Sequence, residues 1–127
     1  MLMNCKWIGF YIPREFFKKF RNYTKKKNQQ YSNNSVVEIT GKEIIYFALK
    51  EMIEENSFQY QVEKEDQRET EEYLSAELPI PFIEKFEKYF CEKKKEAEER
   101  GEKLKVKRKW LLLFALNQVI DGDLFHR

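Results

Sequence analysis

Two short stretches of the chain have a hydrophobic residue at every second position, and each ends at a proline. In residues 7–12 the alternate positions hold Ile, Phe and Ile, and in residues 73–78 they hold Leu, Ala and Leu. A period of two is typical of a β-strand that buries one of its faces. Pro13 and Pro79 follow directly, and proline cannot donate the next hydrogen bond of a ladder. The pattern therefore predicts two half-buried strands.

Four further stretches carry apolar residues at the three- and four-residue spacing of an amphipathic helix. Proline suits the first turn of a helix, so Pro13 and Pro79 also indicate where two helices begin. Thr40 and Glu43 have the spacing of a capping box, which indicates the start of a third. The predicted helices run from residue 14 to about 29, from the capping box to about 55, from 79 to 100, and from the basic run at 103–109 to about 120.

Polar segments separate these elements. Residues 29–35 are rich in Asn, Gln and Ser, which is typical of a loop, and residues 56–72 are acidic. Within the acidic segment Phe58, Tyr60 and Val62 alternate with polar residues, so a short extra strand is one interpretation of it.

The second half of the chain repeats the first. An offset of 66 residues aligns Pro13/Pro79, Phe16/Phe82, Lys19/Lys85, Phe20/Phe86, Tyr23/Tyr89 and Lys27/Lys93, and an offset of 67 aligns Lys42/Lys109, Phe47/Phe114, Ala48/Ala115, Leu49/Leu116 and Ile53/Ile120. A period this long, seen twice, indicates two copies of one small unit. We therefore interpret residues 1–56 as a first strand-helix-helix repeat, 57–71 as an acidic connector and 72–127 as the second repeat.

The two repeats are expected to share one core. A unit of about 60 residues is marginally stable alone, and a lone strand cannot satisfy its backbone hydrogen bonds. The nearest partner for each strand is the strand of the other repeat. The sequence thus predicts a mainly helical fold in which a short two-stranded antiparallel ribbon joins duplicated β-α-α units.

The charge divides along the same lines. Residues 1–53 carry 10 basic and 4 acidic side chains, residues 54–77 carry 2 and 9, and residues 78–127 carry 12 and 9. Basic repeats suit a polyanionic partner, whereas an acidic connector is most often a solvated spacer. The basic cluster at residues 105–109 is the best polyanion candidate, because the positive end of a helix dipole adds to it.

Little in the sequence favours catalysis. Cys5, Cys91 and His126 share no metal-ligand spacing, and both cysteines are expected to be free thiols. Gly-rich phosphate loops and nucleophile–base pairs are absent from the sequence. We expect a protein that is not an enzyme and that uses no metal or cofactor. The longest apolar run is far shorter than a bilayer span, so the sequence predicts no membrane segment and a cytoplasmic protein.

Each half has the order alternating strand, proline, amphipathic helix and second helix. The second helix has an Ile-Ile-x-x-Ala-Leu or a Leu-Leu-x-x-Ala-Leu face. This order resembles that of the ribbon-helix-helix DNA-binding proteins. Those are dimers of a shorter chain, so the resemblance implies a single-chain, monomeric pseudodimer that is able to assemble further. It also implies that outward ribbon residues enter the major groove of double-stranded DNA and that the second helix of each unit binds phosphate at its N-terminus. The implied groove face is Trp7, Gly9, Tyr11, Tyr73, Ser75 and Glu77, and the implied phosphate sites are Thr40, Gly41 and Lys42 with Lys107, Arg108 and Lys109.

Two functions follow from this resemblance. The first is a DNA-binding protein, either a transcriptional regulator or a plasmid or viral accessory factor. The second is a protein-binding module of the same fold, because the implied groove face has no Arg, Lys, Asn or Gln to read base edges and contains Glu77. A third interpretation of Trp7, Tyr11 and Tyr73 is structural, since aromatic residues favour strands. The lysine runs at Lys25 and Lys93 are interpreted as solvated helix ends.

Overall fold

A computed structural model of the chain describes residues 4–31, 37–59, 70–100 and 106–126. Within these residues it is mainly helical, with a two-stranded antiparallel sheet. The elements are β1 (Cys5–Pro13), α1 (Arg14–Tyr31), α2 (Gly41–Glu55), β2 (Glu71–Pro79), α3 (Ile80–Glu99) and α4 (Arg108–Gly122). This confirms the predicted mainly helical fold with a short ribbon, and the order is compatible with two β-α-α units.

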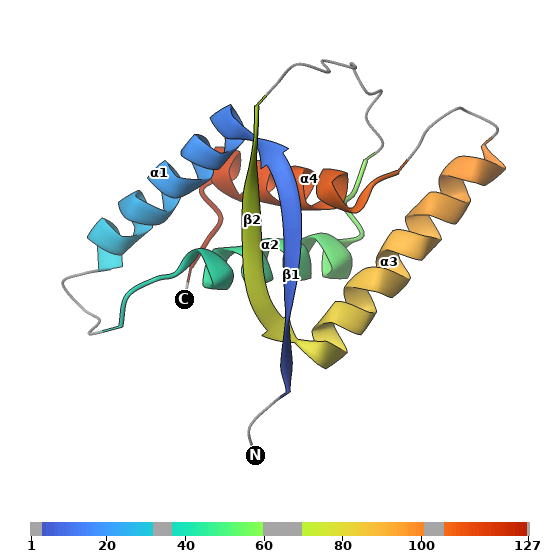
Figure 1. Cartoon of the computed structure of the whole chain (residues 1–127), viewed down its shortest axis with the longest axis horizontal. Coiled ribbons are helices and arrows are strands. Elements are labelled where there is room, and N and C mark those ends of the chain that lie inside the picture. Colours follow the sequence, from blue (N-terminus) through green and yellow to red (C-terminus); the bar gives the residue numbers. More distant parts are fainter. Residues whose placement is uncertain (1–3, 32–36, 60–69, 101–105, 127) are drawn as a thin grey trace.

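The two strands form a ribbon in front of the helices (Figure 1). They pair antiparallel with Gly9 opposite Ser75 at the centre of the register. Behind the ribbon α2 and α4 pack together and run in opposite directions, while α1 and α3 extend to either side. Because alternate strand residues point to opposite faces, one face of the ribbon packs on the helices and the other faces solvent.

Local sequence signals explain where the helices begin and end. Pro13 and Pro79 each end a strand and precede a helix, as predicted. Thr40 caps α2 by accepting the backbone N–H of Glu43, which confirms the part of the predicted capping box that Thr40 supplies. After α2 and α4, Asn56 and Asp123 adopt the left-handed conformation, where Asn and Asp are tolerated better than other side chains.

The core lies between the ribbon and the helices and takes side chains from both halves of the chain. The inward faces predicted for the second and fourth helices are buried throughout: Ile44, Ile45, Ala48, Leu49 and Met52 on α2, and Leu111, Leu112, Ala115, Leu116 and Val119 on α4. Ile12, Leu78 and Phe86 are also almost fully buried. The two halves therefore bury their apolar faces in one cluster.

Hydrogen bonds tie each half to the other in matching positions. The backbone N–H of Arg14 donates to the carbonyl of Thr70, and that of Ile80 donates to the carbonyl of Asn4. These two bonds are related by the offset of 66 residues that aligns the repeats.

Some boundaries differ from the predictions. Both strands are longer, and β2 takes in Glu71 and Glu72, because pairing with β1 holds polar residues in the ladder beyond the alternating pattern. Helix α1 continues to Tyr31 and so includes residues predicted as loop. Phe58 is buried but lies outside a strand, while Tyr60 and Val62, the other two residues of the suggested extra strand, lie outside the described residues.

Candidate functional site

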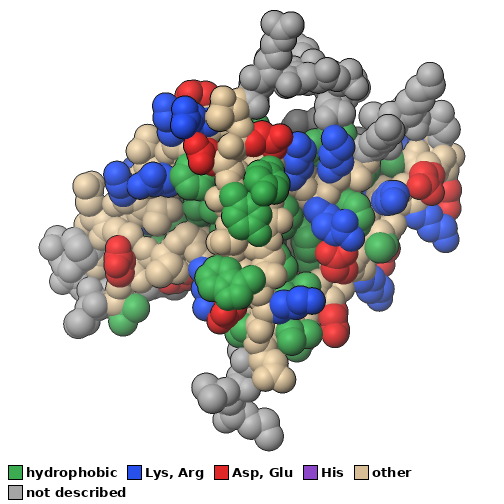
Figure 2. All heavy atoms as spheres, viewed as in Figure 1, with side chains coloured by type: hydrophobic (Ala, Val, Ile, Leu, Met, Phe, Trp, Pro, Cys, Tyr) green, Lys and Arg blue, Asp and Glu red, His purple; other side chains and the backbone are tan. Residues whose placement is uncertain are grey.

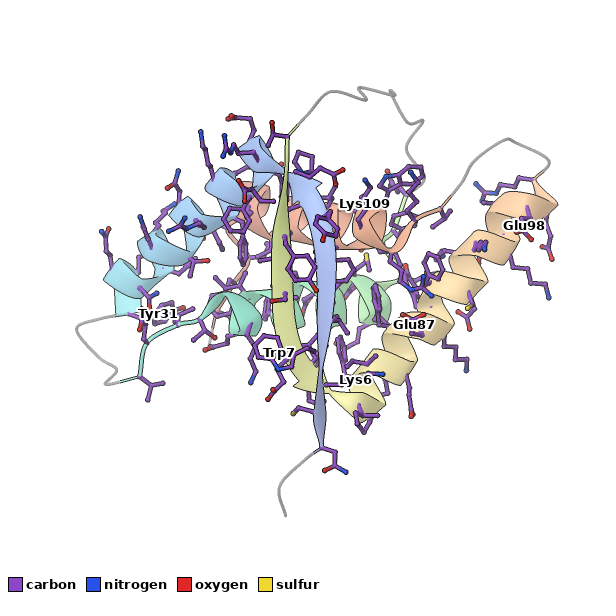
Figure 3. All side chains as sticks on the ribbon, in the orientation of Figure 1. Lys6, Trp7, Tyr31, Glu87, Glu98 and Lys109 are labelled. Atoms are coloured by element: carbon purple, nitrogen blue, oxygen red, sulfur yellow. The ribbon has the colours of Figure 1, made fainter. Side chains whose placement is uncertain are left out.

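The outer face of the ribbon carries the six residues of the predicted groove face. Trp7, Tyr11 and Tyr73 are 65, 62 and 56% exposed, which is unusual for large aromatic side chains. Gly9 and Ser75 are exposed at the centre, and Glu77 is half-buried opposite Trp7. We call these six residues the outer ribbon face. Figure 2 shows hydrophobic side chains gathered along it, and Figure 3 labels Trp7 near one end.

Two tyrosines meet on this face. Tyr11 and Tyr73 are cross-strand partners, and their ring centroids lie 5.1 Å apart. A Cβ atom added to Gly9 would lie only 1.8 Å from the hydroxyl oxygen of Tyr73. Glycine at position 9 therefore gives the Tyr73 side chain room to lie across the ribbon.

The start of α2 holds the first predicted phosphate site. The hydroxyl of Thr40 is already occupied by the backbone N–H of Glu43, so it serves the helix cap. Gly41 packs close to the Phe20 ring, where an added Cβ would lie 3.1 Å from ring carbons. Lys42 is exposed in the first turn. Of these three residues, Lys42 has the side chain best suited to an anion.

The start of α4 holds the second predicted phosphate site, and its cations have intramolecular partners. Arg108 donates to both carboxylate oxygens of Glu87, at 2.8 Å from Nε and 2.8 Å from Nη2, and lies over the Phe90 ring. These hydrogen bonds to Glu87 raise the pKa of Arg108. Lys109 lies 3.6 Å from Glu71, and Lys107 lies over the Trp110 ring. The cluster is therefore partly neutralised, most completely at Arg108.

The two helix starts lie on opposite sides of the ribbon, because α2 and α4 cross behind it in opposite directions (Figure 1). Lys and Arg side chains accordingly flank the aromatic outer ribbon face on both sides in Figure 2. Lys6 and Lys109 are labelled beside the ribbon in Figure 3. Positive charge therefore borders the aromatic strip, although Glu77 lies within it.

Each half contains a buried Lys–Tyr pair that the sequence patterns did not predict. Lys27 and Lys93 are only 4 and 6% exposed, and each ammonium group lies over the ring of Tyr23 or Tyr89, one turn earlier on its helix. The prediction that both lysine runs are solvated is therefore wrong for Lys27 and Lys93, whereas the other lysines of the two runs, from Lys25 and from Lys94, are exposed as expected. Both pairs are identical between the repeats, and that shared spacing was a signal of a common structural role.

Each of these two tyrosines forms hydrogen bonds with the segment that follows the second helix of the other half. Tyr23 donates to Asp123 and accepts from the backbone N–H of Phe125, and burial raises the pKa of Tyr23 to about 12. Tyr89 donates to Asn56 and accepts from the N–H of Phe58, and burial also raises the pKa of Tyr89.

The two halves differ in the acidic residue that pairs with the buried lysine. Lys27 forms an ion pair with Asp123, whereas Lys93 pairs with Glu96 on its own helix. Hydrogen bonds from Lys27, and then from Tyr23, lower the pKa of the Asp123 carboxyl group.

Other parts of the described chain offer little chemistry. Among residues 4–31, 37–59, 70–100 and 106–126 there is no group of three or more His, Cys, Asp or Glu side chains placed to hold a metal ion. Both cysteines are exposed, and His126 is exposed near the end of the chain. A pocket beside α2 and α4 is lined by Ala48, Glu51, Glu55, Ser57, Ala115, Gln118, Val119 and Leu124. In the described part of the molecule every buried side-chain nitrogen or oxygen has a hydrogen-bond partner, so the pocket has no unpaired buried group aimed into it.

None of the helices in the described ranges has both the length and the apolar character needed to cross a membrane. Comparison with protein-family models, with curated proteins and with solved structures finds no match.

Proposed function

We propose that this chain is a DNA-binding regulator or accessory factor that presents its ribbon to duplex DNA. One observation carries the proposal: an exposed two-stranded ribbon is bordered on both sides by the N-termini of packed helices and by basic side chains. The major groove of B-DNA is about 12 Å wide and admits a two-stranded ribbon. Helix N-termini and lysines attract the phosphates that line such a groove.

We further propose that the chain is a single-chain ribbon-helix-helix pseudodimer. The repeat in the sequence, the order β1-α1-α2-β2-α3-α4 and the antiparallel ribbon support this interpretation. The matched bonds of Arg14 and Ile80 support it as well, since each reaches the residue that precedes the partner strand. In a dimer of separate chains, contacts of this kind would lie between protomers.

In this proposal the outer ribbon face contacts base edges, and Lys42, Lys107 and Lys109 contact the backbone. Arg108 has a structural role, because its guanidinium group is already bound to Glu87. The phosphate contacts supply affinity without sequence information, whereas the ribbon supplies specificity.

A protein-binding module is the second candidate, and the composition of the ribbon favours it. Three exposed aromatic side chains and no basic or amide side chain form the outer ribbon face. Exposed Tyr and Trp commonly dominate the energy of protein interfaces. Under this alternative, the helix starts have no nucleic acid partner.

A gel-shift titration with random-sequence duplex DNA at two salt concentrations tests the proposal. We expect binding that weakens steeply as salt rises, because each neutralised phosphate releases condensed counterions. No binding at the lower salt concentration would favour the protein-binding module. Binding without a change on raising the salt would contradict the assigned phosphate contacts.

A further inference from the structure

The ribbon has a centre where equivalent positions of the two repeats face each other. Gly9 pairs with Ser75 in the register, and the offset of 66 residues also relates Gly9 to Ser75. The same offset relates each remaining residue of the outer ribbon face to a residue on the other side of this central pair. The Tyr11–Tyr73 pair on one side thus corresponds to the Glu77–Trp7 pair on the other. We call these two pairs the tyrosine end and the tryptophan end.

The central pair makes the two ends different in shape as well as in chemistry. Gly9 leaves space that the Tyr73 side chain occupies, since an added Cβ would collide with the Tyr73 hydroxyl. Ser75, the equivalent residue of the other repeat, has a Cβ atom where Gly9 has none. The tyrosine end is therefore a packed pair of rings, whereas the tryptophan end combines one ring with the carboxylate of Glu77.

The spacing of the tyrosine rings restricts what they can bind. An unpaired base sandwiched between two rings needs about 7 Å between them, twice the 3.4 Å base spacing. The Tyr11 and Tyr73 centroids are 5.1 Å apart and the rings are tilted by 54°, so this pair has no slot for a base. The two ring faces present apolar surface instead, beside the polar phenol hydroxyl groups. The apolar group that base pairs expose in the major groove is the C5-methyl group of thymine.

We propose that the tyrosine end recognises thymine C5-methyl groups in the major groove of duplex DNA. The tryptophan end does not share this preference, so the preferred site is not a palindrome. This inference rests on the proposed function. Positive charge on both sides of the ribbon complements the two phosphate backbones that border a groove. Tyr11, Tyr73 and Gly9 are then specificity-determining residues.

The test removes methyl groups from the DNA and leaves the base pairing unchanged. Sites bound by the chain of residues 1–127 are first selected from a random duplex pool. Each thymine is then replaced by deoxyuridine, in one half of the selected site at a time. We expect affinity to fall about fourfold for each contacted methyl group, the ratio that corresponds to about 0.8 kcal/mol. The loss is expected in one half-site only.

Variants assign this loss to the tyrosine end. With Tyr11→Ala and Tyr73→Ala together, the deoxyuridine duplex and the thymine duplex should bind equally well. Gly9→Ala keeps both tyrosines but displaces the Tyr73 ring, so it should reduce the thymine preference without removing a ring. Leu124→Ala is the control, because it shortens an apolar side chain that is 50% exposed and lies off the ribbon. It should leave the preference unchanged.

The outcomes separate the two proposals. The thymine inference is overturned, and DNA binding is left intact, if deoxyuridine does not lower the affinity for the duplex. The same holds if deoxyuridine lowers the affinity equally in both halves of the DNA site. Selected sites without thymine in either half would also overturn the thymine inference alone. Failure of the chain of residues 1–127 to bind any duplex would overturn both proposals. A one-sided penalty that persists in the double tyrosine variant would also contradict the assignment.

Discussion

Tyr23 on α1 binds the chain beyond α4: its hydroxyl oxygen accepts the backbone N–H of Phe125 at 3.3 Å. Tyr89 on α3 does the same beyond α2, where it accepts the N–H of Phe58 at 3.3 Å. The first helix of each half thus holds the end of the second helix of the other half. These two bonds join segments 102 and 31 residues apart in sequence.

Tyr23→Phe should destabilise the fold by about 1–3 kcal/mol, because the buried N–H of Phe125 loses its acceptor. The ring remains, so the change isolates the hydroxyl group. Urea unfolding followed by circular dichroism measures the loss. Tyr31→Phe is the matched control on the same helix and should change the free energy of unfolding by less. Equal effects of the two substitutions would contradict the role given to Tyr23.

The pairing of Asp123 with Lys27 predicts a dependence of stability on pH. The carboxyl pKa lies below its ordinary value of 3.8 in the folded chain. A depressed pKa adds stability that is fully present above the unfolded pKa and is lost as pH falls through the folded pKa. The free energy of unfolding should therefore decrease as pH falls below about 4.

Asp123→Asn tests this, because Asn56 already holds the equivalent position and accepts from Tyr89. The substitution keeps an acceptor for Tyr23 and a residue that tolerates the left-handed conformation. It should reduce the loss of stability at acid pH. Urea unfolding at several pH values between 3 and 7 gives the free energy of unfolding of the unsubstituted chain and of the Asp123→Asn variant. If the variant loses as much stability at acid pH as the unsubstituted chain, Asp123 is not the source of that loss.

Separated halves should not fold alone. In the described part of the chain β1 pairs only with β2, and the apolar faces of α2 and α4 cover each other. Residues 1–56 and 70–127, made separately, should be largely unfolded or should associate, because each exposes a full apolar face. Mixing them should restore helical structure. A stable monomeric half, detected by circular dichroism and sedimentation, would contradict the shared core.

The sequence predicted the fold wherever periodicity and local signals agreed. Ile44 and Leu49 lie on the apolar face of the helix that Thr40 caps, and they are fully buried. The extension of β2 to Glu71 was not predictable, since only pairing with Pro13 on the other strand keeps it in the ladder. Local sequence cannot specify a partner that lies so far along the chain.

Side-chain partners at the candidate site were harder to predict. Lysine is rarely buried, so a lysine run near the end of a helix favoured a solvated interpretation of Lys93. Its burial depends on the ring of Tyr89 and the carboxylate of Glu96. The bond between Arg108 and Glu87 likewise depends on how α3 packs beside the start of α4. The contact between Arg108 and Glu87 arises from tertiary packing, whereas Tyr89, Lys93 and Glu96 lie on one helix, where the repeated Tyr–Lys spacing was a local signal.

Glu87→Gln should strengthen DNA binding, because it releases the guanidinium group of Arg108 from a carboxylate beside the start of α4. If Arg108 then contacts one phosphate, the slope of log affinity against log salt should steepen by about 0.9. Glu84→Gln is the control, since it makes the same change of charge at an exposed position of α3. Equal slopes in the two variants would mean that Arg108 does not reach phosphate.

Glu77 offers the most direct test of whether the ribbon enters a groove. It lies opposite Trp7 on the outer ribbon face, half-buried. A carboxylate about 10 Å from a phosphate in water is repelled by about 0.4 kcal/mol, which is roughly twofold in affinity for each nearby phosphate. Glu77→Gln should therefore tighten binding to duplex DNA severalfold at low salt, and the gain should shrink as salt rises.

Glu54→Gln provides the control for Glu77→Gln, because it removes the same charge from an exposed position at the end of α2, away from the outer ribbon face. The two variants are compared by titration against one duplex at several salt concentrations. If Glu77 accepts a hydrogen bond from a cytosine amino group, Glu77→Gln should instead relax the preference at one base pair, by about 1–3 kcal/mol. Either result places Glu77 beside DNA. If Glu77→Gln and Glu54→Gln bind alike at every salt concentration and on every duplex, the ribbon lies outside the groove, and the aromatic strip of Trp7, Tyr11 and Tyr73 is better explained as a surface for a protein partner.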